Sequence, residues 1–555
     1  MDADVDLAFV NGAVYAVDAA SSWARAVAVR DGRIVAVGTE DEIREHVGSA
    51  TEIVDLAGKM LLPGFQDAHI HAPTGGMDRL RIDLSEVHSW DDYAAAITSW
   101  AAANPTAPWI LGGGWAMDIF EVGTPSRAQL DALVPDRPAY LTNRDLHAAW
   151  VNSKALEVAG VDASIADPSD GRFERTGEGD IQGTLHEGAM SAVRRSVPEP
   201  SLDDLEAAVL EAQRYLHALG ITAWQDAIVG DYPAMVSGRE AYPSLAGRGA
   251  LTARVVGALW LERGRGIEQV DDLIAARAST AAPGYAPTSV KIMLDGVCEN
   301  FTAAMLRSYL GPGGEETGNA GLEYFDPETL REITVRLDAE GFQLHIHVIG
   351  DRACRDALDA IEAARVANGP NDLRHHLAHI QVVHPDDVSR FRALGVTANA
   401  QPLWAAHEAQ MDELTIPFVG PERASWMYPF ASLLATGATL AGGSDWPVST
   451  PDVLQELHVA VHRTSPPGYT YGGPSDDVFL PAERITLGQA IRAFTMGSAF
   501  VNHLDRETGS IEVGKLADLV VLSEDLFTLE SPTDARVLMT VIGGHPVFEA
   551  DRSQL

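Results

Sequence analysis

The sequence predicts an α/β protein whose central part is a TIM-like (β/α)8 barrel. Three observations support this prediction. Short apolar strands alternate with Ala-rich helical stretches through the middle of the chain, these strands number eight, and both ends of the chain have an all-β character instead. The eight expected strands are residues 64–71, 221–226, 253–260, 289–295, 342–347, 373–379, 396–401 and 438–445.

The two ends of the chain are expected to form one small β-sandwich subdomain. Residues 1–63 hold short strand-like runs such as "LAFVNGAVYAV" and "AVAVRDGRIVAVG", and residues 500–555 repeat this style in "GSIEVGKLADLVVLS". Residues 64–499 would then form the barrel. The gap of roughly 150 residues between the first two barrel strands is too long for one βα connection, so we expect an insertion over about 72–200 beside the barrel mouth.

Composition excludes several classes of partner. The chain has 555 residues, of which 40 are Lys or Arg and 79 are Asp or Glu, so its formal net charge is −39. Such a charge repels nucleic acids and anionic membranes. Two cysteines make no disulfide framework, and no run of 18 apolar residues is present. We therefore expect a cytoplasmic protein with no nucleic-acid or membrane partner. A small-molecule substrate and a possible homodimer are separate expectations.

Polar residues near the ends of five expected strands predict a metal site. In a strand, residues i and i+2 share a face, so His69 and His71 would stand side by side. The carboxyl ends of all barrel strands meet at one rim. Singly, each residue has an ordinary alternative as a hydrogen-bonded core histidine, a paired lysine or a helix cap; together they suit a divalent ion. The converging residues are His69, His71, Lys291, His345, His347, His379 and Asp445.

Lys291 is unusual because it interrupts the apolar strand "SVKIML". Only four residues of the chain are lysine, which leaves 40 − 4 = 36 arginines. A buried lysine must be paired or neutralised, because desolvation lowers its pKa. A neutral amine can form a Schiff base or can react with carbon dioxide to give a carbamate that acts as a bridging carboxylate. The nearby histidines favour the carbamate.

These motifs resemble those of the amidohydrolase superfamily, and within it amidohydrolase family 3, also called YtcJ-like. The similar phrases are "DLAGKMLLPGFQDAHIHA", "VKIMLDG", "HVIGDRA", "LAHIQVV", "GGSDWPV" and "GSIEVGKLADLVVL". The resemblance implies two divalent ions, with zinc expected. One ion would bind His69, His71 and Asp445, the other His347 and His379, and carboxylated Lys291 would bridge them. His347 carries the match because it directly precedes "VIGD", and the role of His345 stays open.

The resemblance also implies hydrolysis of amide-like C–N bonds by a metal-bound hydroxide. Metals lower the pKa of bound water and polarise carbonyl groups. Asp445 would take the proton of the attacking water and pass it to the leaving nitrogen. Linear amides, formamides, cyclic amides and carbamates all suit this chemistry, and the fold cannot choose among them.

Two alternative functions remain open on the same barrel. A deaminase would use one metal and an acidic residue after strand five, for which Asp351 is available. A non-catalytic regulator on a relic barrel is the second alternative.

The insertion phrase "GTLHEGAM" contains His186 and Glu187, to which we assign no role. The expected substrate pocket contains His147, Trp224, Gln401, Trp404 and Trp446.

Overall fold

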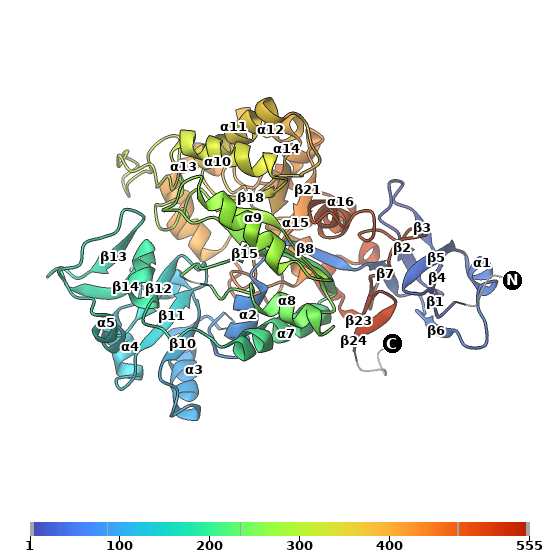
Figure 1. Cartoon of the computed structure of the whole chain (residues 1–555), viewed down its shortest axis with the longest axis horizontal. Coiled ribbons are helices and arrows are strands. Elements are labelled where there is room, and N and C mark those ends of the chain that lie inside the picture. The colour runs from blue at the N-terminus through green and yellow to red at the C-terminus, as the bar shows by residue number, and fades with distance from the viewer. Residues whose placement is uncertain (1–4, 86, 122, 234, 474–476, 551–555) are drawn as a thin grey trace.

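The computed structural model describes residues 5–85, 87–121, 123–233, 235–473 and 477–550. Figure 1 shows a central barrel with a β-rich lobe on one side, which contains β10 to β14, and on the other side a sandwich of strands such as β1 and β23. The barrel therefore separates the two smaller parts.

The central sheet has eight parallel strands in the order β21-β20-β19-β18-β17-β16-β15-β8, and all eight expected strands are present. This confirms the predicted barrel. Their bounds are β8 (Phe65–Ile70), β15 (Ile221–Val229), β16 (Arg254–Trp260), β17 (Tyr285–Met293), β18 (Gln343–Val348), β19 (His376–His379), β20 (Thr397–Ala400) and β21 (Leu440–Gly442).

Several strand ends differ from the expected bounds for a backbone reason. β19 begins three residues later than expected, after Arg374, whose φ of 58° is incompatible with a strand. β21 ends at Gly442, because the chain then turns through Asp445, which has a φ of 57°. The turn moves Asp445 out of the sheet and onto the rim.

Hydrogen bonds between β8 and the end of β21 close the barrel. The amide nitrogen of Asp445 donates to the carbonyl oxygen of His69 at 2.7 Å, and that of His71 donates to the carbonyl oxygen of Trp446 at 2.8 Å. The Asp67 carboxylate accepts a hydrogen bond from Ser444 Oγ at 2.6 Å. The segments that carry His69, His71 and Asp445 are thus fixed to each other directly.

Amphipathic helices cover the outside of the barrel. α7 begins after Ser201, which forms a capping box with Asp204, and buries one apolar stripe that includes Val209 and Leu216. The helices of this layer are α7 (Leu202–Ala218), α8 (Ala241–Gly247), α9 (Gln269–Thr280), α10 (Pro327–Ala339), α11 (Asp351–Asn368), α12 (Pro385–Leu394), α13 (Ile416–Ala424), α14 (Phe430–Ala435), α15 (Val453–His462), α16 (Leu487–Arg492) and α17 (Ser498–Val501).

Strands from both ends of the chain pack as two sheets at the sandwich end of the molecule. One apolar cluster joins the sheets, with Phe9 and Val27 from the four-stranded sheet and Leu61 and Val521 from the six-stranded sheet. The first sheet contains β1 (Leu7–Val10), β4 (Ala26–Arg30), β5 (Arg33–Gly38) and β6 (Glu52–Asp55), with α1 (Glu40–Arg44) beside it. The second contains β2 (Ala13–Tyr15), β3 (Trp23–Ala24), β7 (Met60–Pro63), β22 (Leu519–Leu522), β23 (Val537–Ile542) and β24 (His545–Glu549).

The segment between the first two barrel strands forms its own six-stranded sheet with helices. α2 (Ala72–Arg79) lies against α7 instead, where a Cβ on Gly76 would stand only 1.9 Å from the carbonyl oxygen of Ala208. The separate lobe therefore begins at β9, later than expected. Its elements are β9 (Ile82–Asp83), β10 (Ile110–Trp115), β11 (Ala139–Asn143), β12 (Ala148–Val151), β13 (Gly171–Arg175) and β14 (Ile181–Glu187), with α3 (Trp90–Ala103), α4 (Arg127–Leu133), α5 (Ser153–Ala159) and α6 (Ser191–Arg194).

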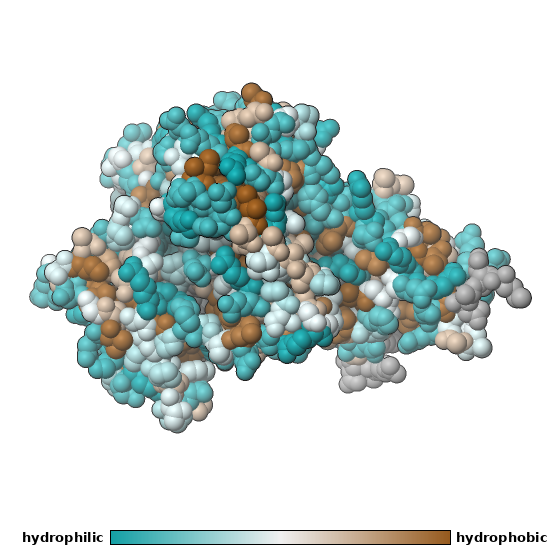
Figure 2. All heavy atoms as spheres, in the orientation of Figure 1, coloured by the Kyte–Doolittle hydropathy of each residue, from teal (hydrophilic) through white to brown (hydrophobic). Residues whose placement is uncertain are grey.

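Hydrophilic side chains cover most of the face seen in Figure 2, and apolar side chains appear there only as small separate patches. This agrees with the excess of acidic residues in the sequence. Within the described ranges, no helix combines the length and the apolar character needed to cross a membrane.

Candidate metal centre

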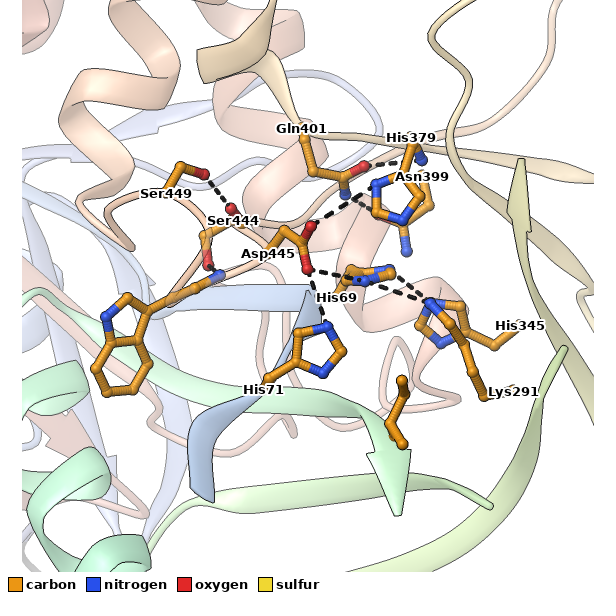
Figure 3. A network of polar contacts seen from close by, with 12 residues as sticks. His69, His71, Lys291, His345, His379, Asn399, Gln401, Ser444, Asp445 and Ser449 are labelled. Carbon is orange, nitrogen blue, oxygen red and sulfur yellow. Dashed lines mark hydrogen bonds and ion pairs between the residues drawn. The ribbon is translucent and has the colours of Figure 1, made fainter. Parts of the chain in front are cut away.

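The structure brings the six expected ligands together at the carboxyl end of the barrel. Each of them is at most 4% exposed. β8, β17, β18 and β19 supply His69, Lys291, His347 and His379, whereas His71 and Asp445 lie just beyond β8 and β21. Figure 3 shows the imidazoles of His69, His71 and His379 turned toward the Asp445 carboxylate.

Asp445 lies at the centre of this cluster. Its Oδ1 is 3.1 Å from His69 Nε2 and 3.0 Å from His71 Nε2, and its Oδ2 is 3.9 Å from His379 Nδ1. Among the described residues, no backbone amide or hydroxyl donates to Asp445 Oδ1, so its nearest polar neighbours are these imidazole nitrogens. A buried carboxylate that faces imidazoles fits a cation held between the oxygen and the nitrogens.

The ionisation of the histidines also fits a metal. Burial, with the nearby positive charge of Lys291, holds the pKa of His69 and that of His379 well below the usual range. Burial likewise lowers the pKa of His347 well below that range. Neutral imidazole is the form that ligates metals. The cluster therefore offers free nitrogen lone pairs at neutral pH.

Lys291 lies beside this cluster, and no Asp or Glu side chain of the described ranges forms an ion pair with its amine. Its Nζ is 3.5 Å from His69 Nε2, and its side chain is fully buried. Burial lowers the pKa of Lys291 to about 7, although the charge of Asp445 opposes this shift. A large fraction of the amine is thus neutral at physiological pH, which is the form that reacts with carbon dioxide.

A chain of buried hydrogen bonds below the cluster fixes the tautomer of His69. Gln225 Oε1 can only accept, so His345 Nδ1, which lies 2.6 Å away, carries a proton. His345 Nε2 must then accept a hydrogen bond from His69 Nδ1 at 2.7 Å. The lone pair of His69 is therefore on Nε2, which faces both Asp445 and Lys291 Nζ. The role that the sequence left open for His345 is to orient a ligand.

Asp295 performs the same task for His347. Its carboxylate accepts hydrogen bonds from His347 Nδ1 at 3.1 Å and from the backbone nitrogens of Ile349, Gly350 and Ala304 at 3.2, 2.8 and 3.0 Å. The proton on Nδ1 leaves His347 Nε2 as the ligating atom. Sequence reasoning did not assign Asp295, although it lies only four residues after Lys291 in "VKIMLDG".

His379 lies close to ligands that the resemblance assigns to each of the two ions. One ligand atom each from His69, His379 and Asp445 lies within 4.8 Å of the others. The resemblance assigns His379 to the second ion together with His347, whose ring centroid lies 4.5 Å from that of His379.

Strained backbone accompanies two of the ligands. His379 has a φ of 75° and Asp445 a φ of 57°. Residues other than glycine rarely adopt such positive values. Gln401 Oε1 accepts a hydrogen bond from the backbone nitrogen of His379 at 2.8 Å and thereby holds this conformation. Such strain persists where the surrounding structure fixes a functional geometry.

A cavity opens above the ligands, and only some of the expected pocket residues line its wall. His147 and Trp404 line it, together with apolar side chains such as Met235 and Val448. Trp404 stacks on His379, with ring centroids 5.1 Å apart and an interplanar angle of 4°. Charged residues also line this cavity: Arg144, Asp145, Glu299 and Glu408.

Three expected pocket residues are not part of this wall. Trp224 is fully buried and donates a hydrogen bond from Nε1 to the hydroxyl of Tyr242 at 3.3 Å. Gln401 is buried behind His379. Trp446 borders a second cavity, beside Tyr215. These assignments were wrong because position near a strand end does not fix the direction of a long side chain.

Comparisons with known proteins show extensive similarity. The sequence pattern of the amidohydrolase family matches residues 52–548, and that of a bacterial imidazolonepropionase-like composite domain matches residues 26–46. The chain is 32% identical to Protein LONG AFTER FAR-RED 3 of Arabidopsis thaliana, over 98% of this chain and 91% of that protein. It is 29% identical to putative amidohydrolase YtcJ of Bacillus subtilis, over 97% and 98% of the two chains.

Two further similarities concern activity and fold. The chain is 29% identical to an N-substituted formamide deformylase of Arthrobacter pascens, over 94% of each chain. Among solved structures, an uncharacterized metal-dependent hydrolase from Pyrococcus furiosus superposes with a TM-score of 0.70 at 25% identity, covering 94% of this chain and 99% of that one.

We predict that the purified protein contains divalent metal and that a strong chelator lowers its melting temperature. Removal of the metal leaves the buried Asp445 carboxylate without a counter-charge, and a bound metal stabilises only the folded state. Elemental analysis and melting curves check this. A metal-free sample whose melting temperature does not respond to added zinc would contradict the proposed centre.

We also predict that His345→Ala lowers metal affinity by roughly 10–100-fold, the usual effect of losing a residue that orients a ligand. His345→Gln should restore part of the affinity, because its amide oxygen can accept the His69 proton. Competitive metal titration measures both. His375→Gln is the matched control, since His375 is buried in a bond to Asp338 outside the site. Equal affinities in all of these variants would disprove the orienting role.

Proposed function

We propose that this chain, which belongs to the amidohydrolase family, hydrolyses an amide-like C–N bond in a small molecule. Family membership and the solved neighbour make it a metal-dependent hydrolase. The bond that it cleaves is our inference. N-acyl and N-formyl amides, cyclic amides and carbamates are the candidate substrates, and N-substituted formamides come first because of the deformylase relative.

The Asp445 carboxylate and its imidazole neighbours are the observation that carries this proposal. The carboxylate lies among three neutral imidazoles and a buried lysine, and within the described ranges no backbone amide or hydroxyl donates to its Oδ1. A structural aspartate would be satisfied by backbone or side-chain donors, as Asp295 is. Asp445 instead keeps an open acceptor that faces the cavity.

The residues present would hold divalent ions, for which we expect two zinc ions: His69, His71, His347, His379, Asp445 and a carboxylated Lys291 would be the ligands. A bound divalent ion lowers the pKa of coordinated water from about 15.7 toward 7 and polarises a carbonyl oxygen. The carbamate supplies a negative charge that the four histidines lack. Lys291 is suited to this modification because burial lowers its pKa to about 7.

Asp445 then accepts the proton of the attacking water. Its carboxylate lies at the cavity wall and next to the ligating nitrogens, so a reacting water there is within reach of its oxygen. The apolar part of the wall, including Met235, Val448 and Trp404, favours a substrate with an aliphatic or aromatic substituent. The cavity thus suits a small amide more than a polymer.

The deaminase alternative finds less support. It requires an acidic proton donor after the fifth strand, where the sequence offers Asp351. This residue instead begins α11, is 1% exposed, and accepts a hydrogen bond from the backbone nitrogen of Leu306 at 2.8 Å. A regulator without catalysis would have no need for the buried open ligand atoms.

We predict that Lys291→Ala and Lys291→Arg both abolish most activity and metal occupancy, because neither side chain can form a carbamate. In the wild type, ¹³C-labelled bicarbonate should give a carbamate carbon signal by NMR that both variants lack. Lys154→Arg is the matched control, since the side chain of Lys154 is 40% exposed and pairs with Glu157. An active Lys291→Arg protein with full metal content would rule out the bridge.

Asp445→Asn should reduce kcat by at least ~10²-fold, the low end for a lost general base, while the fold remains intact. Asp518→Asn is the control for stability: Asp518 is 4% exposed and binds Arg254 at 2.6 and 2.9 Å, where the sandwich meets the barrel. This control should lower the melting temperature and leave kcat unchanged. Near-normal kcat in Asp445→Asn would remove the catalytic assignment.

A further inference from the structure

His147 and Glu187 form a buried pair that the proposed reaction has not yet used. His147 Nδ1 is 2.7 Å from Glu187 Oε1, and the two residues are 6% and 2% exposed. Both belong to the β-rich lobe: His147 directly precedes β12, and Glu187 ends β14, the antiparallel neighbour of β12. The backbone nitrogen of Glu187 donates to the carbonyl oxygen of His147 at 3.0 Å.

Residues of the barrel loops also contact the Glu187 carboxylate. Thr302 Oγ1 donates to Glu187 Oε1 at 3.3 Å, and a guanidinium nitrogen of Arg263 lies 3.6 Å from Oε2. Arg263 itself stacks over the ring of Tyr324 at 3.7 Å. Glu187 has φ 52° and ψ −127°, a strained conformation for a residue with a side chain. Contacts from both the lobe and the barrel thus fix the carboxylate.

His147 extends this pair to the reaction cavity. It lines the same cavity as the ligands, and its ring centroid is 5.7 Å from that of His347. A carboxylate can only accept, so the proton on Nδ1 points to Glu187. Within the described ranges, the remaining nitrogen, Nε2, has no hydrogen-bond partner in the protein. It is therefore available to a molecule in the cavity.

Charge favours a protonated His147. Glu187 Oε1 lies 2.7 Å from His147 Nδ1, and both side chains are buried, so water screens the charge of the carboxylate only weakly. A fixed anion next to an imidazole stabilises the imidazolium, as in other acid–base pairs.

We propose that His147 is the catalytic residue that gives a proton to the leaving nitrogen, and that Glu187 is its positioning residue. This inference rests on the proposed C–N hydrolysis and deepens it. The Asp445 carboxylate lies next to the imidazoles of His69, His71 and His379, whereas the imidazole of His147 lies next to that of His347. Two separate groups can therefore serve the water and the leaving group.

The proton balance of this step is simple. A C–O bond forms from the water oxygen to the carbonyl carbon, and Asp445 takes the proton that the water loses. The C–N bond breaks with its electron pair left on nitrogen, which takes the Nε2 proton of His147. Proton exchange with solvent through the cavity restores both residues. One amide and one water give one carboxylic acid and one amine.

The test compares leaving groups in formamides that differ in the basicity of the released amine. His147→Gln should reduce kcat at least ~10²-fold for N-benzylformamide, and far less for 4-nitroformanilide, whose weakly basic nitrogen needs little protonation. Glu187→Gln keeps the volume but loses the charge, so it should show the same trend to a smaller extent, with KM nearly unchanged. Glu187→Asp should restore part of kcat.

His186→Gln is the matched control for both variants. Like His147, His186 pairs with a glutamate: its Nε2 is 3.0 Å from Glu174. His186 is fully buried in β14, the strand that ends at Glu187, but it does not line the cavity. It should lose stability without any change in leaving-group dependence. An active wild type with equal losses for both formamides in His147→Gln would overturn the donor role and leave the hydrolase proposal standing. A wild type inactive on every amide class would overturn both.

Discussion

The burial of the ligand atoms around Asp445 is the constraint on which the rest of the structure depends. His69, His71 and His379 surround the Asp445 carboxylate, and Lys291 lies beside them as a buried amine. In a medium of low dielectric constant, these groups are compatible only with a cation or with extensive loss of charge. A metal resolves this conflict, and catalysis uses the charge that the metal supplies.

The fold satisfies this constraint by fixing each ligand from behind. Gln225 and His345 lie inside the barrel, where apolar side chains are usual, and form a polar column that orients His69. Asp295 orients His347 in the same way. The β-rich lobe adds a second function, because it covers the barrel mouth with its own charged pair. The proposed proton donor to the leaving group thus comes from a different part of the chain than the proposed metal ligands.

The sequence predicted the barrel, its eight strands and the ligand cluster, because strand periodicity and the common rim of a parallel barrel fix where His69 or Asp445 must lie. The family resemblance is confirmed by the match over residues 52–548. The inward or outward direction of Trp224 could not be predicted, since it depends on packing. Nor could the pairing of His147 with Glu187, which requires the register of β12 and β14 and loops from the barrel.

Anomalous diffraction from crystals of the active enzyme tests the central claim most directly, because it locates metal without reference to activity. We expect anomalous peaks at about 2.0–2.2 Å from the nitrogens of His69, His71, His347 and His379 and from an Asp445 oxygen. Electron density should also extend beyond Lys291 Nζ as a carbamate between the peaks. Active crystals with no anomalous peak, and with Asp445 hydrogen-bonded to protonated histidines instead, would contradict the account.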